Sequence, residues 1–108
     1  MATRTPAPQW LPNAPPNISN SSSISPSPAR YDDLISFSGS ATDSDGIVVS
    51  YLWESTYEGE TVTLSTEPSF NITGLEVGTH YICFVVEDND EDTSIFCWNL
   101  VINPNTVP

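Results

Sequence analysis

Positive charge is almost absent from this sequence. It contains no lysine, and Arg4 and Arg30 are its only arginines, whereas aspartate and glutamate together number 14, so the net charge is −12. Nucleic acids and anionic membrane surfaces both bind clusters of basic side chains. Two arginines cannot form such a cluster, so we predict that the protein does not bind nucleic acid and that cations are its natural partners.

Long apolar runs are also absent. No stretch approaches the length of a membrane-spanning helix, and the start MATRTPAPQW lacks the hydrophobic segment of a signal peptide. We therefore predict no membrane insertion. If the protein is exported, this chain is expected to be a mature piece or an excised part of it.

Residues for catalysis are scarce as well. His80 is the only histidine and there are two cysteines, so no His/Cys set can hold zinc or copper. His80 opens an alternating strand at an inward position, which favours a half-buried structural role over that of a general base. Glu58 and Glu60 are a carboxylate pair of the kind that cleaves glycosides, but they lie in a tight turn without a cleft for a sugar ring. We predict that the protein is not an enzyme.

What is present favours strands. Proline is high at ten residues, Ser, Thr and Asn are abundant, and short alternating segments recur between turn signals without a helical period. Val49, Tyr51 and Trp53 are expected on one face of their strand. The pattern predicts an all-β, immunoglobulin-like antiparallel β-sandwich of about seven strands. The expected strands are 17–24, 34–38, 47–54, 61–64, 70–72, 80–87 and 94–102.

The chain divides into three predicted parts. Residues 1–16 carry five prolines and form a linker or docking arm, residues 17–103 form the sandwich, and residues 104–108 form a tail. Trp10 and Leu11 lie inside the arm. Because a tryptophan is costly to leave in water, we expect Trp10 and Leu11 to dock on a surface.

The last two expected strands place the cysteines opposite each other. Cys83 and Cys97 each lie seven residues from Asp90, at the centre of the turn between these strands. Directly opposed residues of an antiparallel pair are close enough for a disulfide. The register therefore predicts a Cys83–Cys97 bridge and an oxidising compartment. Two buried free thiols are the alternative.

The same register makes both faces of this hairpin apolar. One face carries Ile82, Phe84, Val86, Phe96 and Trp98, and the other carries Tyr81, Cys83, Val85, Ile95 and Cys97. A sheet with one solvated face should alternate apolar with polar residues. We therefore predict that Tyr81, Val85 and Ile95 belong to an interface. It is covered by the Trp10 arm, by the arm of a neighbouring copy or by an adjacent domain, unless these side chains simply tolerate exposure.

Two acidic loops are expected at one end of the sandwich. The topology brings Asp43 and Asp45 near Asp88, Asp90 and Asp92. Clustered carboxylates raise one another's pKa or bind a hard cation such as Ca²⁺. The segment from Asp88 is not an EF-hand loop, because it lacks the required glycine and glutamate and is flanked by strands. The alternative is a set of solvated carboxylates that serve solubility.

From Leu34 onward the chain resembles the polycystic-kidney-disease-type (PKD) repeat. The matching segments are Phe37-Ser38-Gly39-Ser40-Ala41, Asp43-Ser44-Asp45-Gly46-Ile47, Tyr51-Leu52-Trp53, Gly74-Leu75 with Gly78, Val86-Glu87-Asp88-Asn89-Asp90 and the earlier Asn13-Ala14-Pro15-Pro16. The family's usual Trp-Asp-Phe-Gly-Asp-Gly is replaced here by Trp53-Glu54-Ser55-Thr56-Tyr57-Glu58-Gly59. The resemblance implies Ca²⁺ ligands at Asn13, Asp43, Asp45 and Asp88, and a role in spacing, adhesion or polysaccharide contact.

These inferences lead to three functional hypotheses. The first is a non-catalytic, structural or adhesive module at the cell surface or outside the cell, which contacts neighbouring domains or copies and is stiffened by Ca²⁺. The second is a carbohydrate-binding accessory domain of a secreted hydrolase, for which Trp10, Tyr31 and Tyr57 are the free aromatic residues. The third is a filament subunit whose arm docks on the next copy.

Overall fold

A computed structural model describes residues 14–104, which form ten β-strands and no helix. Within this range nothing is therefore helical and apolar enough to cross a membrane. The strands are β1 (Asn17–Ile18), β2 (Ser23–Ser25), β3 (Ala29–Arg30), β4 (Ile35–Ser38), β5 (Ala41–Thr42), β6 (Val48–Tyr57), β7 (Glu60–Ser65), β8 (Ser69–Ile72), β9 (Gly78–Asp88) and β10 (Thr93–Asn103).

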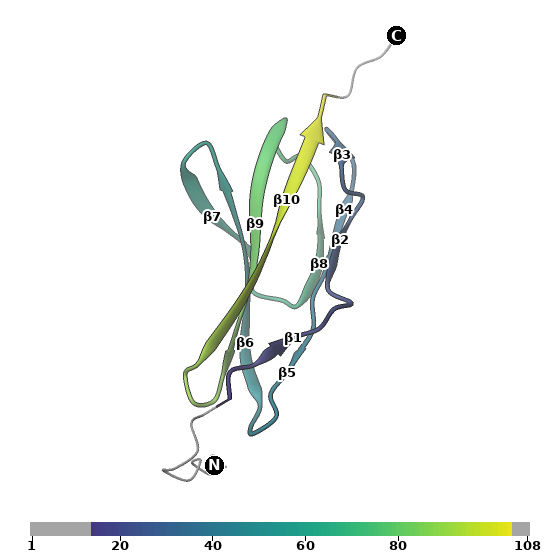
Figure 1. The fold of residues 1–108 in the computed structure, drawn as a ribbon. Coiled ribbons are helices and arrows are strands. Elements are labelled where there is room, and N and C mark those ends of the chain that lie inside the picture. The colour runs from purple at the N-terminus through teal and green to yellow at the C-terminus, as the bar shows by residue number, and fades with distance from the viewer. Residues whose placement is uncertain (1–13, 105–108) are drawn as a thin grey trace.

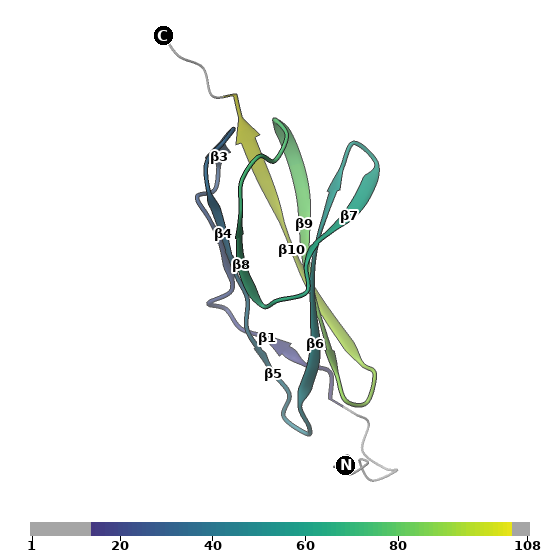
Figure 2. The same cartoon turned by 180° about the vertical axis from the view of Figure 1, so that it is seen from behind.

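The strands form two facing sheets and one short ladder. One sheet has the order β3-β10-β9-β6-β7, the other has the order β2-β4-β8, and β1 pairs with β5. The pairing of β3 with β10 is parallel and all other pairs are antiparallel. Figures 1 and 2 show the two sheets face to face, with the β1–β5 ladder toward one end. The predicted immunoglobulin-like β-sandwich is confirmed.

The core lies between the sheets and is centred on Trp53 of β6. This side chain is fully buried, its ring stacks on Phe84 at a centroid distance of 4.5 Å, and it meets Phe37 edge-on at 5.3 Å. The indole Nε1 donates a hydrogen bond of 3.0 Å to the carbonyl of Pro68. Trp98 stacks on the same ring at 5.4 Å, in agreement with its expected place at the core.

The strand boundaries differ from the expected ones mainly in the first third of the chain. The single strand expected over 17–24 is divided into β1 and β2 by a turn in which the Ser22 amide donates to the Ser19 carbonyl. The two-residue strands β3 and β5 were not expected, because two residues carry no alternation. The longer strands β6 to β10 lie where the alternating pattern placed them.

One predicted face is wrong. Tyr51 and Trp53 do share the core-facing side of β6, where they pair with Val86 and Phe84. A register shift occurs between Val48 and Ser50, so Val49 is an inserted residue and is 52% exposed. A β-bulge places two residues opposite one and breaks the simple alternation. Val48 packs against the core instead.

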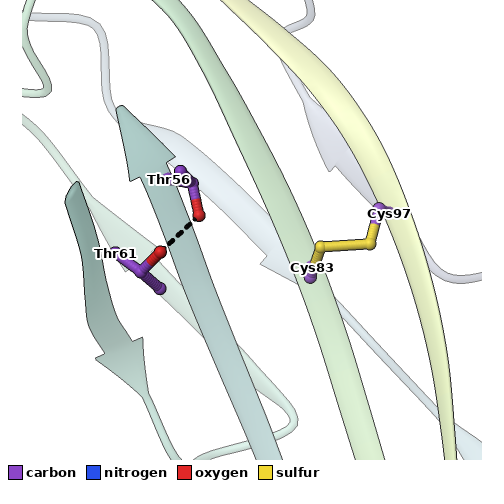
Figure 3. The surroundings of a disulfide bond; sticks show 4 residues. All are labelled: Thr56, Thr61, Cys83 and Cys97. Carbon is purple, nitrogen blue, oxygen red and sulfur yellow. Dashed lines mark hydrogen bonds between the residues drawn. A yellow bond between two sulfur atoms is a disulfide. The ribbon is translucent and has the colours of Figure 1, made fainter. Parts of the chain in front are cut away.

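The β9–β10 hairpin has the predicted register, including Cys83 opposite Cys97. The structure contains the disulfide between them, with the Cα atoms 4.1 Å apart (Figure 3). In the chain-entropy description, closing a loop of this length contributes about 3 kcal/mol to stability. Phe96 has the predicted orientation but is 53% exposed, since the shorter three-stranded sheet does not cover the whole hairpin.

Candidate functional site

The β5–β6 and β9–β10 loops lie side by side at one end of the sandwich (Figures 1 and 2). Asp43 and Asp45 belong to the first loop and Asp88 ends β9. One carboxylate oxygen from each of these three residues lies within 4.8 Å of the other two. The structure thus brings together three of the four residues predicted as metal ligands, and we call this region the acidic end.

Asn89 holds the two loops against each other. Its backbone amide donates to the Ile47 carbonyl at 3.1 Å, and its side-chain Oδ1 accepts from the Ile47 amide at 3.1 Å. Gly46 makes this approach possible, because a Cβ atom there would lie 2.3 Å from Asn89 Oδ1 and 3.0 Å from Asp43 Oδ2. Sequence reasoning did not assign a role to Asn89. Its signals were its position between two acidic residues and its place in the segment from Val86 to Asp90 that matches the PKD repeat.

Asp88 is the structural centre of its loop. Its side chain is 1% exposed, and its Oδ1 accepts hydrogen bonds of 2.9 Å from the amides of Asp90 and Asp92. These bonds curl the loop around the carboxylate and fix its orientation. Asp90 and Asp92 were expected to join the carboxylate cluster, but they are not among the residues whose ligand atoms converge. Their backbone groups help to build the site, because both amides donate to Asp88 Oδ1 and the Asp92 carbonyl accepts from the Asp88 amide.

Asp43 has the opposite character. Both of its carboxylate oxygens are shielded from solvent, and neither has a hydrogen-bond partner among the described residues. Burial raises the pKa of the Asp43 carboxyl, and the neighbouring carboxylates of Asp45 and Asp88 raise it further, while the nearby backbone of Asp45 opposes this shift by a smaller amount. A buried carboxylate without a partner carries a large desolvation cost. A cation among the three carboxylates would remove this cost.

Asp45 connects the acidic end to the start of the described chain. It is exposed, and its Oδ2 accepts a hydrogen bond of 2.9 Å from the Ala14 amide. The fourth predicted ligand, Asn13, lies outside the described residues, as do Trp10 and Leu11 of the predicted interface.

The opposite end of the sandwich holds a second group of buried polar side chains, which we call the histidine end. His80 is 3% exposed and Ser55 is 2% exposed. The imidazole Nε2 donates to the Glu76 carbonyl at 2.8 Å, so Nδ1 is the acceptor for the Ser55 hydroxyl at 3.0 Å. The Tyr57 ring stacks on the imidazole at 4.3 Å, and its hydroxyl donates to the Val77 carbonyl.

A cavity of about 240 Å³ opens beside this group and is lined by Val62, Leu75 and Glu76 among others. Burial raises the pKa of Tyr57, and the nearby carboxylates of Glu58 and Glu76 add to the effect. Both imidazole nitrogens are hydrogen-bonded within the protein, which agrees with a structural role for His80. The Tyr57 ring, expected to be free, is engaged.

The predicted interface residues Tyr81, Val85 and Ile95 share the face of the five-stranded sheet that is turned away from the core. Tyr81 is 51% exposed and Ile95 is 59% exposed, whereas Val85 is half-buried. The apolar residues therefore lie on the predicted face. Their cover, if there is one, is not among residues 14–104.

The fold and the acidic end together define an immunoglobulin-like β-sandwich module whose two acidic loops meet at one end. The sequence profile of the family described as "K319L-like, PKD domain" matches residues 30–102. That match spans most of the chain, which therefore belongs to this family of PKD domains. The resemblance predicted from the sequence motifs is confirmed. No curated protein matches the chain significantly.

Solved structures share the fold. A structure of carbohydrate-binding modules from the β-sandwich superfamily superposes with a TM-score of 0.73 at 25% identity, over 89% of this chain and 37% of that one. The PKD1 domain of Vibrio anguillarum Epp gives a TM-score of 0.64 at 18% identity, over 86% of this chain and 99% of that one. The PKD1 domain of the Vibrio cholerae metalloprotease PrtV gives 0.63 at 21% identity, over 83% and 99%. The chain thus spans only 37% of the first of these structures.

Proposed function

We propose that this chain is a non-catalytic extracellular module, structural or adhesive, that is stiffened by Ca²⁺ at its acidic end. The observation that carries the proposal is the buried carboxylate of Asp43, whose two oxygens lack hydrogen-bond partners beside two further carboxylates. Native proteins seldom leave buried polar atoms unpaired, and a bound ion is one recognised way in which such atoms are satisfied. The charge of the cluster requires that ion to be a cation.

The donor atoms favour a hard cation. Asp43, Asp45 and Asp88 offer only oxygen, and no sulfur or imidazole ligand belongs to the cluster. Ca²⁺ takes six to eight oxygen ligands in flexible geometry. Three carboxylates can supply part of this set. Asn13 is the proposed fourth side-chain ligand, and water or carbonyl oxygens would complete the shell.

An ion at this position would join three segments of the chain. Asp43 and Asp45 lie on the β5–β6 loop, Asp88 lies at the start of the β9–β10 loop, and Asp45 is bonded to the amide of Ala14. Binding would therefore fix the direction in which the preceding residues leave the sandwich. Such a joint is useful in a protein whose modules are arranged in series, because the stiffness of the connection sets their relative orientation.

Two further observations support an extracellular location. The Cys83–Cys97 disulfide is typical of oxidising compartments. The high negative charge suits solubility and contact with cations.

Calcium titration tests the proposal directly. Chelator-treated protein is titrated with CaCl₂ in a calorimeter and by amide NMR, with MgCl₂ at equal ionic strength as a comparison. We expect one binding site and shifts confined to the amides of Gly46, Asp88 and Asn89. The D43N/D45N variant should lose the binding. Glu67→Gln, which removes an exposed carboxylate from the β7–β8 loop, is the matched control and should bind normally.

The proposal of a metal site is wrong if CaCl₂ produces neither heat nor localised shifts. It is also wrong if Glu67→Gln weakens the response as much as D43N/D45N does. That result would mean that the ion only screens the overall negative charge.

Carbohydrate binding is a second candidate, because the structure with a TM-score of 0.73 is described as a set of carbohydrate-binding modules. Such sites use exposed aromatic rings. Tyr57 is engaged with His80, which leaves Tyr31 at 38% exposure and Tyr81 at 51% among the described tyrosines. A panel of soluble and insoluble glycans, with Tyr81→Ala as the variant, tests this role. Absence of binding to every glycan would contradict this role, and binding that survives in Tyr81→Ala and in Tyr31→Ala would show that neither ring forms the site.

A further inference from the structure

The cavity beside His80 opens on the core-facing side of the five-stranded sheet. Val62 of β7 pairs with Ser55 of β6, and directly opposed residues of an antiparallel pair share a face. Ser55 is 2% exposed but Val62 is 48% exposed, so the cover of this face ends between β6 and β7. Figures 1 and 2 show the β6–β7 hairpin diverging from β9 at this end. We call this space, of about 240 Å³, the histidine-end cavity.

The polar side chains at the floor of the cavity already have partners. Ser55 and His80 form the floor, because they are the buried residues of the lining, and they bond to each other at 3.0 Å. The second imidazole nitrogen bonds to the Glu76 carbonyl, and the Tyr57 hydroxyl, also in the lining, bonds to the Val77 carbonyl. A polar group that enters the cavity gives up its water for little in return. The interior therefore favours an apolar group over a sugar.

The size of the cavity favours a single side chain. Val62 and half-buried Leu75 give it apolar walls that a guest would remove from water. Pockets that bury a drug-sized ligand measure about 300–1,000 Å³. At about 240 Å³, the histidine-end cavity is smaller than these pockets and suits one apolar side chain.

The rim of the cavity is acidic. Glu60 and Glu76 belong to the lining and are exposed. Burial raises the pKa of Tyr57, and the carboxylates of Glu58 and Glu76, which lie close to it, raise that pKa further. Arg30, the only arginine that the structure describes, lies on β3, at the opposite edge of the sheet from β7. The rim thus attracts basic side chains from another molecule.

An apolar pocket with a charged rim is a common arrangement at protein–protein contacts. One anchor side chain fills the pocket, and the charges around it select the partner. A second copy of this chain is a poor partner, because it has no lysine, only two arginines and a net charge of −12. The complementary surface must therefore belong to a different protein or to a different domain.

We propose that the histidine-end cavity receives one apolar side chain of leucine size from another protein or domain, and that basic residues beside that side chain pair with Glu58, Glu60 and Glu76. This contact lies at the end of the sandwich opposite the acidic end. The proposal does not depend on the metal site, and the experiments that test it are done in EDTA.

Short peptides test the proposal on the full chain. The ¹⁵N-labelled protein is titrated at constant ionic strength with the acetylated and amidated tripeptide Lys-Leu-Lys. We expect saturable shifts at the amides of Tyr57, Leu75 and His80. Ser-Leu-Ser keeps the anchor without the charge, and Lys-Ser-Lys keeps the charge without the anchor. Each should bind several-fold more weakly than Lys-Leu-Lys.

Variants of the walls and of the rim assign the binding to the cavity. Val62→Ser should weaken the binding of Lys-Leu-Lys several-fold, whereas Val101→Ser, at an exposed valine of β10 outside the lining, should leave it unchanged. Glu60→Gln and Glu76→Gln should each weaken it about two- to five-fold, because exposed ion pairs are weak. Glu67→Gln is the matched control for charge and should bind normally. Melting temperatures verify that each variant is folded.

Three results would overturn the proposal. The first is the absence of saturable shifts up to the solubility limit of Lys-Leu-Lys. The second is a set of shifts that Val62→Ser leaves unchanged or that Lys-Ser-Lys reproduces, since the peptide would then respond only to the overall negative charge. The third is equal binding of Ser-Leu-Ser and Lys-Leu-Lys, which would remove the basic partner. None of these results bears on Ca²⁺ binding, which is measured separately.

Discussion

The two ends of the sandwich both bury polar side chains, but they satisfy them differently. At the histidine end, His80 has a partner on each ring nitrogen, Ser55 on one side and the Glu76 carbonyl on the other. At the acidic end, Asp88 accepts two amide hydrogen bonds, yet Asp43 beside it has none among the described residues. β9 connects the two regions, with His80 near its start and Asp88 at its last residue.

This difference separates a structural polar group from one that needs a ligand. A buried group that is fully hydrogen-bonded within the fold stabilises one arrangement of its neighbours, and nothing further is required of it. A buried carboxylate without partners costs free energy in the folded state unless something else pairs with it. The histidine end is therefore complete within the chain, whereas we propose that a cation completes the acidic end.

The largest effect is expected from Asp88→Ala. It removes the acceptor of two amide hydrogen bonds in the buried turn, and bonds to a charged acceptor contribute about 1.5–3 kcal/mol each, so the free energy of unfolding should fall by about 3 kcal/mol even without metal. Asp88→Asn keeps an acceptor oxygen and should lose much less stability while still losing Ca²⁺ binding. Urea unfolding in EDTA measures both variants. Equal losses would mean that charge, and not hydrogen bonding, holds the turn.

Calcium should stabilise only one of the two regions. At a free Ca²⁺ concentration about one hundred times its Kd, binding adds about 2.7 kcal/mol to the free energy of unfolding. For amides that exchange by local opening and not by global unfolding, CaCl₂ should slow hydrogen exchange at Asn89 and Asp90. It should not slow exchange at the amides around His80. Thermal unfolding and hydrogen exchange with and without CaCl₂ measure this. Uniform protection of both ends would remove the distinction between them.

Ser55→Ala should destabilise the histidine end without changing the effect of Ca²⁺. The variant leaves the buried Nδ1 of His80 without a partner, and we expect a loss of about 1–2 kcal/mol from the free energy of unfolding. The stabilisation by Ca²⁺ should be unchanged, since the substitution lies at the other end of β9. The free energies of unfolding of Ser55→Ala and Asp43→Asn are measured in EDTA and in CaCl₂, and the gain on adding CaCl₂ is compared between the two variants. A reduced Ca²⁺ effect in Ser55→Ala would show that the ends are coupled.

The smallest expected effect is a dependence on pH. Because the folded protein raises the pKa of Asp43 above its value in the unfolded chain, the protonated carboxyl is favoured in the folded state. Without metal, this residue's contribution to stability should therefore decline as pH rises from about 4 through the raised pKa. Asp43→Asn should not show this decline. The free energy of urea unfolding is measured against pH for the wild type and for Asp43→Asn, and the difference between the two curves gives the contribution of Asp43. A difference of the opposite sign would mean that Asp43 is paired in the metal-free protein.

Much of this arrangement could be predicted from the sequence because it depends on local pattern. The alternation of β9 and β10 fixed which residues share a face, and the equal spacing of Cys83 and Cys97 from Asp90 fixed their pairing. The convergence of Asp43, Asp45 and Asp88 followed from the topology of the sandwich. Each of these inferences needs only a strand period, a turn centre or a known order of strands.

Other features depend on contacts that no local pattern encodes. The inserted residue Val49 breaks the alternation of β6, and nothing in its neighbours marks the bulge. Asp90 and Asp92 have the same side chain as Asp88, yet they join the site through backbone groups that bond to Asp88. Ser55 did not stand out, because its importance lies in a partner that is 25 residues away in the chain.

The sequence by itself thus determined the all-β class, the hairpin register, the disulfide and the set of acidic residues that can converge, since these follow from side-chain period and spacing. Only the tertiary structure decided that Asp43 is buried without a partner, that His80 is fully satisfied and that Ile95 remains exposed. The physical reason is that burial and hydrogen-bond pairing are properties of the packed sheets and meeting loops. They exist only once segments distant in the chain have come together.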